Sequence, residues 1–127
     1  MPVITYPSTL GRVSKLVIHL LECFLSAAHP VNNNVNIRLM TILIDVRENW
    51  EYNVAYIEKS IHIPISEIQN KMHDFDEDQT IVFICHHGVR SRMVGIYFEQ
   101  NEFKNIINLR GGIDSWAKTV DHNMAVY

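Results

Sequence analysis

The residues best suited to chemistry stand together in "CHHGVRS", which runs from Cys85 to Ser91. The preceding "TIVFI" is apolar and rich in β-branched residues, which predicts a buried strand, and the residues after the loop have the spacing of a helix. A chain that turns through Gly88 from strand into helix directs backbone N–H groups and the positive helix end toward the turn. These groups favour a thiolate, so Cys85 is predicted to be a nucleophile at the base of an anion cradle.

The predicted cradle is the loop that follows the cysteine: His86, His87, Gly88, Val89, Arg90 and Ser91. Arg90 is expected to hold oxygens of an anionic substrate in forked geometry, with a plain helix-start arginine as the alternative. For the two histidines, tuning of the thiolate and simple exposure to solvent are both open. Cys85 itself has a second interpretation, as a buried cysteine without chemistry. A zinc site needs three or four ligands, and no second spaced pair accompanies "CHH", so we expect no metal and no cofactor.

The elements around this loop alternate. Strands are predicted at Thr41–Val46, Ser60–Pro64, Thr80–Cys85 and Asn105–Leu109, with helical segments between and after them. The helix after the loop, Ser91–Phe103, is expected to turn Met93, Ile96, Tyr97 and Phe103 inward. Such alternation predicts an α/β domain with a mainly parallel sheet and helices on both faces.

In such sheets ligands bind beyond the carboxyl ends of the strands, where Cys85 lies. Asp45 and Arg47 end the neighbouring strand and are predicted to support the loops or, for Arg47, to orient an anionic substrate.

The chain has 127 residues, 47% of them hydrophobic, and a net charge of −3. These values indicate one globular domain without a basic surface for nucleic acid. Its two cysteines, Cys23 and Cys85, are too few for a disulfide framework, so we expect reduced thiols and a cytoplasmic protein. We divide the chain into an extension, residues 1–36, and a domain, residues 37–127.

The extension contains an apolar stripe with helical spacing between Leu10 and Leu25, which predicts an amphipathic helix docked on the domain. A signal peptide or interfacial anchor is the alternative, and the apolar run is too short to span a bilayer. The same helix is a candidate surface for oligomer formation.

Two known chemistries place a cysteine under such a loop. Protein tyrosine phosphatases need five residues between cysteine and arginine, whereas Arg90 follows Cys85 after four and Arg92 after six, so the phosphatase pattern fails. The loop instead resembles C-x-x-G-x-R-S/T of the rhodanese family. Three further segments are similar to that family in the same order: "LIDVRENWEY", "HIPISEI" and "NLRGGIDSW". The family's usual G-H-I-P-G-A turn is replaced by "AYIEKSIHIP", which leaves the loop itself intact.

The resemblance implies a rhodanese-like fold and a thiosulfate sulfurtransferase activity. Cys85 would accept a sulfane sulfur from an anionic donor such as thiosulfate, carry it as a persulfide, and pass it to cyanide or a thiol. A sulfur-relay protein is a further candidate partner. The alternative function is a rhodanese-fold binding or redox-sensing module that docks a partner protein.

Overall fold

The computed structural model describes residues 3–4 and 41–127. Within these residues the core of the fold is a parallel sheet with strand order β1-β5-β4-β2-β3. The strands are β1 (Val3–Ile4), β2 (Ile42–Asp45), β3 (Ile61–His62), β4 (Thr80–Ile84) and β5 (Asn105–Leu109). The helices are α2 (Asn49–Val54), α3 (Ile65–Ile68), α4 (Val89–Gln100) and α5 (Gly112–Thr119), with a 3-10 turn η2 at Met72–Asp74.

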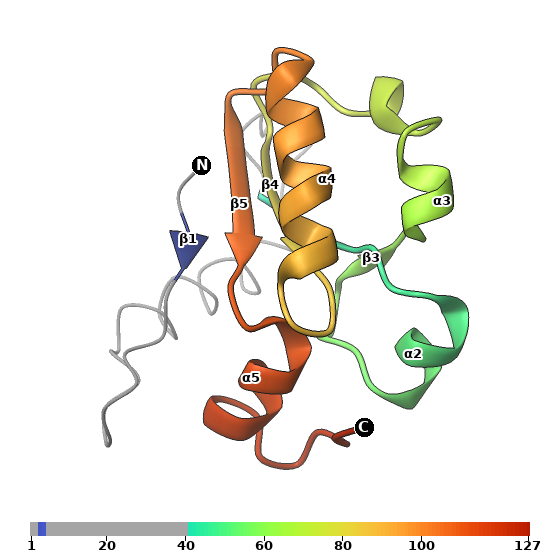
Figure 1. Cartoon of the computed structure of the whole chain (residues 1–127), viewed down its shortest axis with the longest axis vertical. Coiled ribbons are helices and arrows are strands. Elements are labelled where there is room, and N and C mark those ends of the chain that lie inside the picture. Colours follow the sequence, from blue (N-terminus) through green and yellow to red (C-terminus); the bar gives the residue numbers. More distant parts are fainter. Residues whose placement is uncertain (1–2, 5–40) are drawn as a thin grey trace, which may run out of the picture.

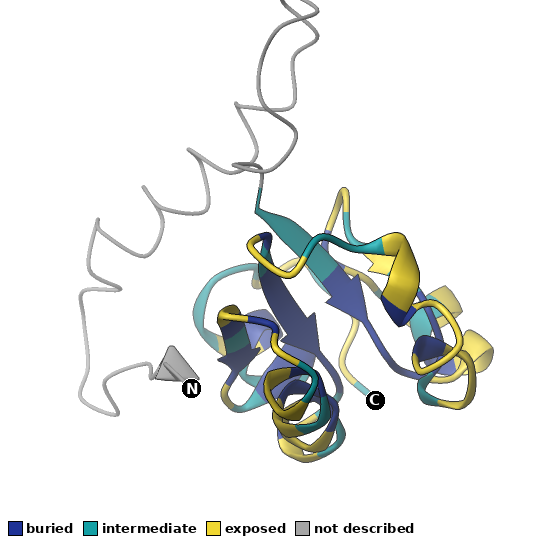
Figure 2. Cartoon of the chain, turned by 90° about the horizontal axis from the view of Figure 1, so that it is seen from above, coloured by how far each residue is buried: buried dark blue, intermediate teal, exposed yellow. Residues whose placement is uncertain are grey.

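Alternate residues of the central strand face two separate apolar layers. Ile81 and Phe83 of β4 pack with Phe98 of α4 in one layer, which also includes residues of α3. Val82 and Ile84 pack with Trp116 of α5 and Leu109 in the other layer. Because side chains alternate along a strand, helices on both faces are needed to cover a strand that is apolar throughout. Figure 2 shows β4 and β5 as mostly buried, with exposed residues on the surrounding helices and loops.

The parallel order places the carboxyl ends of all the strands at one edge of the sheet. At this edge β4 leads into the loop before α4, and β5 leads into α5 (Figure 1). The chain also returns here after α5, so its carboxyl-terminal residues lie beside α2 and α5 (Figure 1). Segments that are distant in sequence therefore meet around the end of β4.

The α/β class, the parallel sheet and the helices on both faces confirm the prediction, but one helix face was predicted wrongly. Met93 and Ile96 were expected to face inward, yet they are 63% and 38% exposed. The inward face of α4 contains Ser91, Val94, Gly95 and Phe98 instead, as well as the expected Phe103 just beyond the helix. The phase differs because Ser91 is turned inward, where its hydroxyl bonds Asn108 and lies 3.2 Å from the Cys85 sulfur, and an apolar pattern does not reveal such polar contacts.

The predictions for the amino-terminal segment have different outcomes. Strand β1, which pairs in parallel with β5, was not anticipated from the sequence. The predicted amphipathic helix and Cys23 lie outside the described residues, and the division at residue 36 stays a prediction. Among the described helices, none has the length and apolar character needed to cross a membrane.

Candidate active site

The Cys85 sulfur lies at the carboxyl end of β4 and is almost completely buried. The backbone N–H of Gly88 donates to Sγ at 3.0 Å. The hydroxyl of Ser91, in the first turn of α4, lies 3.2 Å from the same sulfur. The Gly88 N–H points positive charge at Sγ, and the amino-terminal end of α4 adds its dipole. The sulfur therefore has the surroundings of an anion.

Glycines at two positions allow the loop to close around this sulfur. Gly88 has a φ of +90°, and a Cβ there would lie 3.0 Å from the backbone of Leu109 and of Gly111. Gly112 has a φ of +58°, and a Cβ there would lie 2.3 Å from the carbonyl oxygens of Cys85 and His86. Only a residue without a Cβ fits this close approach. The start of α5 consequently packs directly on the backbone of the cysteine loop.

A buried amide holds the Ser91 hydroxyl in place. Asn108, on β5, accepts from the Ser91 hydroxyl at 2.6 Å and donates its own amide N–H to the Gly88 carbonyl at 3.1 Å. The second bond fixes which end of the amide faces Ser91. The single Ser91 proton thus lies within reach of both Asn108 and the Cys85 sulfur. Asn108 connects the helix start and the loop into one buried polar unit.

The predicted support residues Asp45 and Arg47 form a buried ion pair. Arg47 Nε and Nη2 donate to the Asp45 carboxylate, at distances from 2.6 to 3.1 Å, and both side chains are fully buried. The other N–H groups of Arg47 reach the carbonyls of Glu51 and Ala55 and the hydroxyl of Tyr127. All five guanidinium donors are therefore engaged by the protein, which favours the loop-supporting role over substrate binding.

Arg90 has an acidic partner that sequence reasoning missed. Its two terminal nitrogens each donate to one oxygen of Glu51, both at 2.7 Å. Glu51 belongs to α2 and is buried, whereas about a third of the Arg90 side chain is exposed. The hydrogen bonds from Arg90 lower the pKa of Glu51 to about 2 and raise that of Arg90. Two of the five Arg90 N–H donors are used in this way, and within the described residues the other three have no hydrogen-bond partner.

The two histidines lie on the outer side of the loop. Their rings stack with centroids 4.0 Å apart, and the ring of Tyr127 stacks on the other side of His86 at 4.2 Å. Burial, with a smaller effect of the neighbouring His87, lowers the pKa of His86. The Tyr127 hydroxyl also donates to Glu51 at 3.2 Å. The end of the chain thereby covers the loop and joins it to the ion pairs.

The structure thus brings all the sequence-predicted residues to one edge of the sheet. The residues that sequence analysis missed share one property, since each reaches the site from a distant segment: Glu51, Asn108, Asp114 and Tyr127. Glu51 lies in "RENWEY", and Asn108 and Asp114 lie in "NLRGGIDSW", so the recognised segments were the available signal for these three. Tyr127 lies outside the four recognised segments.

A model of the rhodanese-like domain matches residues 27–119. The chain belongs to the rhodanese family. The putative sulfurtransferase YtwF of Bacillus subtilis is 40% identical to this chain over 74 residues, which are 58% of this chain and 71% of that protein. The putative sulfur carrier protein YrkF of the same organism is 36% identical over 75 residues, or 59% of this chain, but the match spans only 40% of the relative.

Solved structures agree with this membership. The rhodanese-related protein of Thermoplasma volcanium has a TM-score of 0.59 and 36% sequence identity. The match covers 63% of the present chain and 79% of the Thermoplasma chain. A rhodanese-like domain protein of Staphylococcus aureus has a TM-score of 0.61 and 26% identity, with 84% and 91% covered. A putative sulfurtransferase and a putative sulfur carrier protein among these relatives support sulfur transfer in general.

Proposed function

We propose that this protein is a sulfurtransferase that carries a sulfane sulfur as a persulfide on Cys85. The observation that carries the proposal is the Gly88 N–H donor on Sγ beneath the start of α4, with the Ser91 hydroxyl within reach of the same sulfur. These groups stabilise negative charge on sulfur before and after the transfer. The relative YtwF is named as a putative sulfurtransferase, which supports such a role for this chain.

In the proposed reaction the Cys85 thiolate attacks the outer sulfur of an anionic donor such as thiosulfate. The sulfur–sulfur bond of the donor breaks, and sulfite leaves with the bonding electrons. The negative charge moves to the outer sulfur of the new persulfide. A thiol or cyanide then attacks that outer sulfur, and Cys85 leaves as the thiolate. No proton or electron is lost when cyanide is the acceptor, because thiocyanate and the original thiolate are formed.

The structure restricts how Arg90 can assist. With two of its donors on Glu51, it can offer an oxyanion only the remaining N–H groups at its exposed side. The donor's oxygens would then lie close to the Glu51 carboxylate as well. We therefore propose that Arg90 assists binding of the anion and that Glu51 limits this assistance. Arg47 and Asp45 hold the loops beneath.

We further propose a cytoplasmic protein that acts within a sulfur relay. The similarity to a putative sulfur carrier protein supports a protein acceptor in addition to small thiols. An oligomer formed through the amino-terminal segment also stays a proposal.

The intact mass of the full chain after incubation with thiosulfate tests the function. We expect a gain of one sulfur atom that cyanide removes with release of thiocyanate. Cys85→Ser is the control, because its hydroxyl is much less nucleophilic and cannot carry a persulfide. If neither thiosulfate nor a low-molecular-weight persulfide adds sulfur to the wild-type chain, the enzyme proposal is wrong and a binding or sensing module is favoured.

A further inference from the structure

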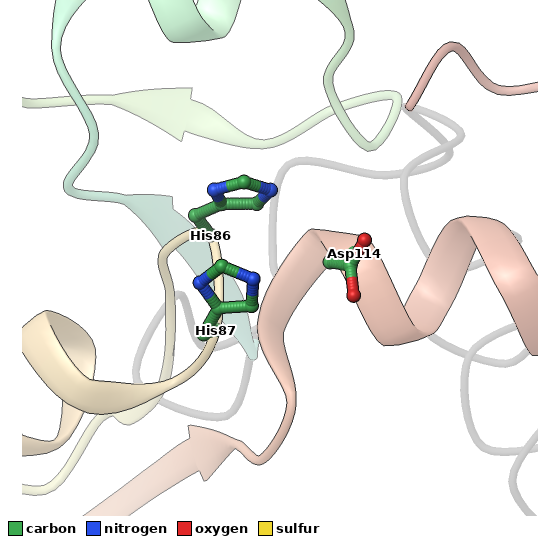
Figure 3. Close-up of side chains that lie close together, drawn as sticks. All are labelled: His86, His87 and Asp114. Carbon is green, nitrogen blue, oxygen red and sulfur yellow. The ribbon is translucent and has the colours of Figure 1, made fainter. Parts of the chain in front are cut away.

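Three side chains with metal-binding atoms converge on the outer side of the cysteine loop. His86 and His87 come from the loop itself, and Asp114 comes from the first turn of α5. One ligand atom of each lies within 4.8 Å of the others. Figure 3 shows both imidazole rings with a nitrogen on the side of the Asp114 carboxylate. Sequence analysis excluded a metal because it found only the two histidines, and the fold supplies the third ligand.

The backbone holds these three residues at a fixed separation. The N–H of Ile113 donates to the Cys85 carbonyl at 2.9 Å, and the N–H of Asp114 donates to the His86 carbonyl at 3.1 Å. The close contact at Gly112 described above leaves no room between the loop and α5. Loop and helix therefore cannot separate without breaking buried contacts. A site on them needs only side-chain rotation to bind an ion, so little ordering entropy opposes binding.

The side chains are free to make that rotation. The rings of His86 and His87 are inclined by 28° to each other. His87 is exposed, so its ring can leave this stack and turn a nitrogen toward an ion that His86 and Asp114 also contact. Asp114 already bonds a cation, because the Lys118 ammonium lies 2.8 Å from its carboxylate. The Lys118 side chain is 60% exposed and can move into solvent. A divalent ion is thus able to replace the Lys118 ammonium at the Asp114 carboxylate.

We propose that His86, His87 and Asp114 form a binding site for a late divalent transition metal, represented by Zn²⁺. Two imidazoles and one carboxylate match the three-ligand sets that hold zinc with an open coordination position. Imidazole ligands favour Zn²⁺, Cu²⁺ or Ni²⁺ over Mg²⁺ and Ca²⁺, which take oxygen ligands. The site is independent of sulfur chemistry on Cys85, so it stands or fails separately from the proposed activity.

The experiment is a calorimetric titration of the full chain with Zn²⁺. Both cysteines are changed to serine, because thiolates bind zinc themselves, and Cys23→Ser with Cys85→Ser leaves the three ligands in place. In this background we expect one saturable site for Zn²⁺ and none for Mg²⁺. Asp114→Asn and His87→Ala should each weaken binding at least tenfold. His73→Ala, which removes an exposed histidine on η2, should leave binding unchanged.

Lys118→Ala is expected to increase the affinity for Zn²⁺, and loss of folding cannot produce such an increase. Removing the ammonium that competes for Asp114 should tighten Zn²⁺ binding by a measurable factor, and the gain should vanish when Asp114→Asn is added. The proposal is overturned if Zn²⁺ does not bind, or if it binds with equal affinity to the Asp114→Asn and His87→Ala variants. Loss of binding on His73→Ala would also overturn it, since the ion would then belong to another site.

Discussion

Glu51 determines both the acid stability of the site and the availability of Arg90, and Glu51→Gln tests both. Its pKa of about 2, against an ordinary 4.5, results first from the hydrogen bonds of Arg90. At about 1.4 kcal/mol per pH unit this difference corresponds to about 3 kcal/mol. Because a third of Arg90 is exposed, screening by solvent reduces the expected effect to about 1–2 kcal/mol.

The sign of the pH dependence follows from the lowered pKa. The stabilisation by ionised Glu51 is complete above the unfolded value of 4.5 and is lost as the pH falls toward the folded value of about 2. We therefore expect Glu51→Gln to lower the free energy of unfolding by about 1–2 kcal/mol at pH 6. The difference from wild type should shrink steadily from pH 5 to pH 2. Urea unfolding at a series of pH values measures it.

A matched control separates this pair from ordinary surface charge. Asp78→Asn breaks the pair with Lys104, in which both side chains are more than half exposed, so we expect little change at any of these pH values. In the same Glu51→Gln protein, Arg90 loses its charged partner and should bind thiosulfate more readily, which lowers KM. If the difference in the free energy of unfolding between wild type and Glu51→Gln stays constant from pH 5 to pH 2, the reasoning is refuted.

Two further substitutions and one insertion test the loop. Gly112→Ala should destabilise the fold by about 1–3 kcal/mol in urea unfolding, since the new Cβ would lie 2.3 Å from the Cys85 carbonyl oxygen, and unchanged stability would contradict this packing. Ser91→Ala removes one donor from the sulfur, worth about 1 kcal/mol, so single-turnover persulfide formation should slow about fivefold; an unchanged rate would exclude a role for the hydroxyl. A glycine inserted between Val89 and Arg90 should widen the loop, weaken sulfur transfer and strengthen phosphate binding. Aryl phosphate hydrolysis by the wild-type chain would instead contradict the choice of sulfur.

The sequence by itself predicted the sheet and the loop that follows Cys85, because both depend on residues that are close together in the chain. The apolar run before Cys85 has the composition of a covered strand, and the loop carries its glycine and arginine within a few residues. The same local evidence could not fix the phase of α4, since Met93 and Ile96 are apolar whether or not they are buried. Ser91 sets that phase through its bonds at the sulfur.

The tertiary structure decided what each charged or metal-binding group of the site faces. Glu51 precedes Arg90 by 39 positions, yet the two form a pair of contacts of 2.7 Å each. Asp114 reaches His86 only because β5 delivers α5 against the cysteine loop. Partners of this kind are set by which strands are neighbours, and a single sequence contains no periodic signal for such pairings. The cysteine loop could therefore be identified from its own residues, whereas the charged and metal-binding partners around it depended on the fold.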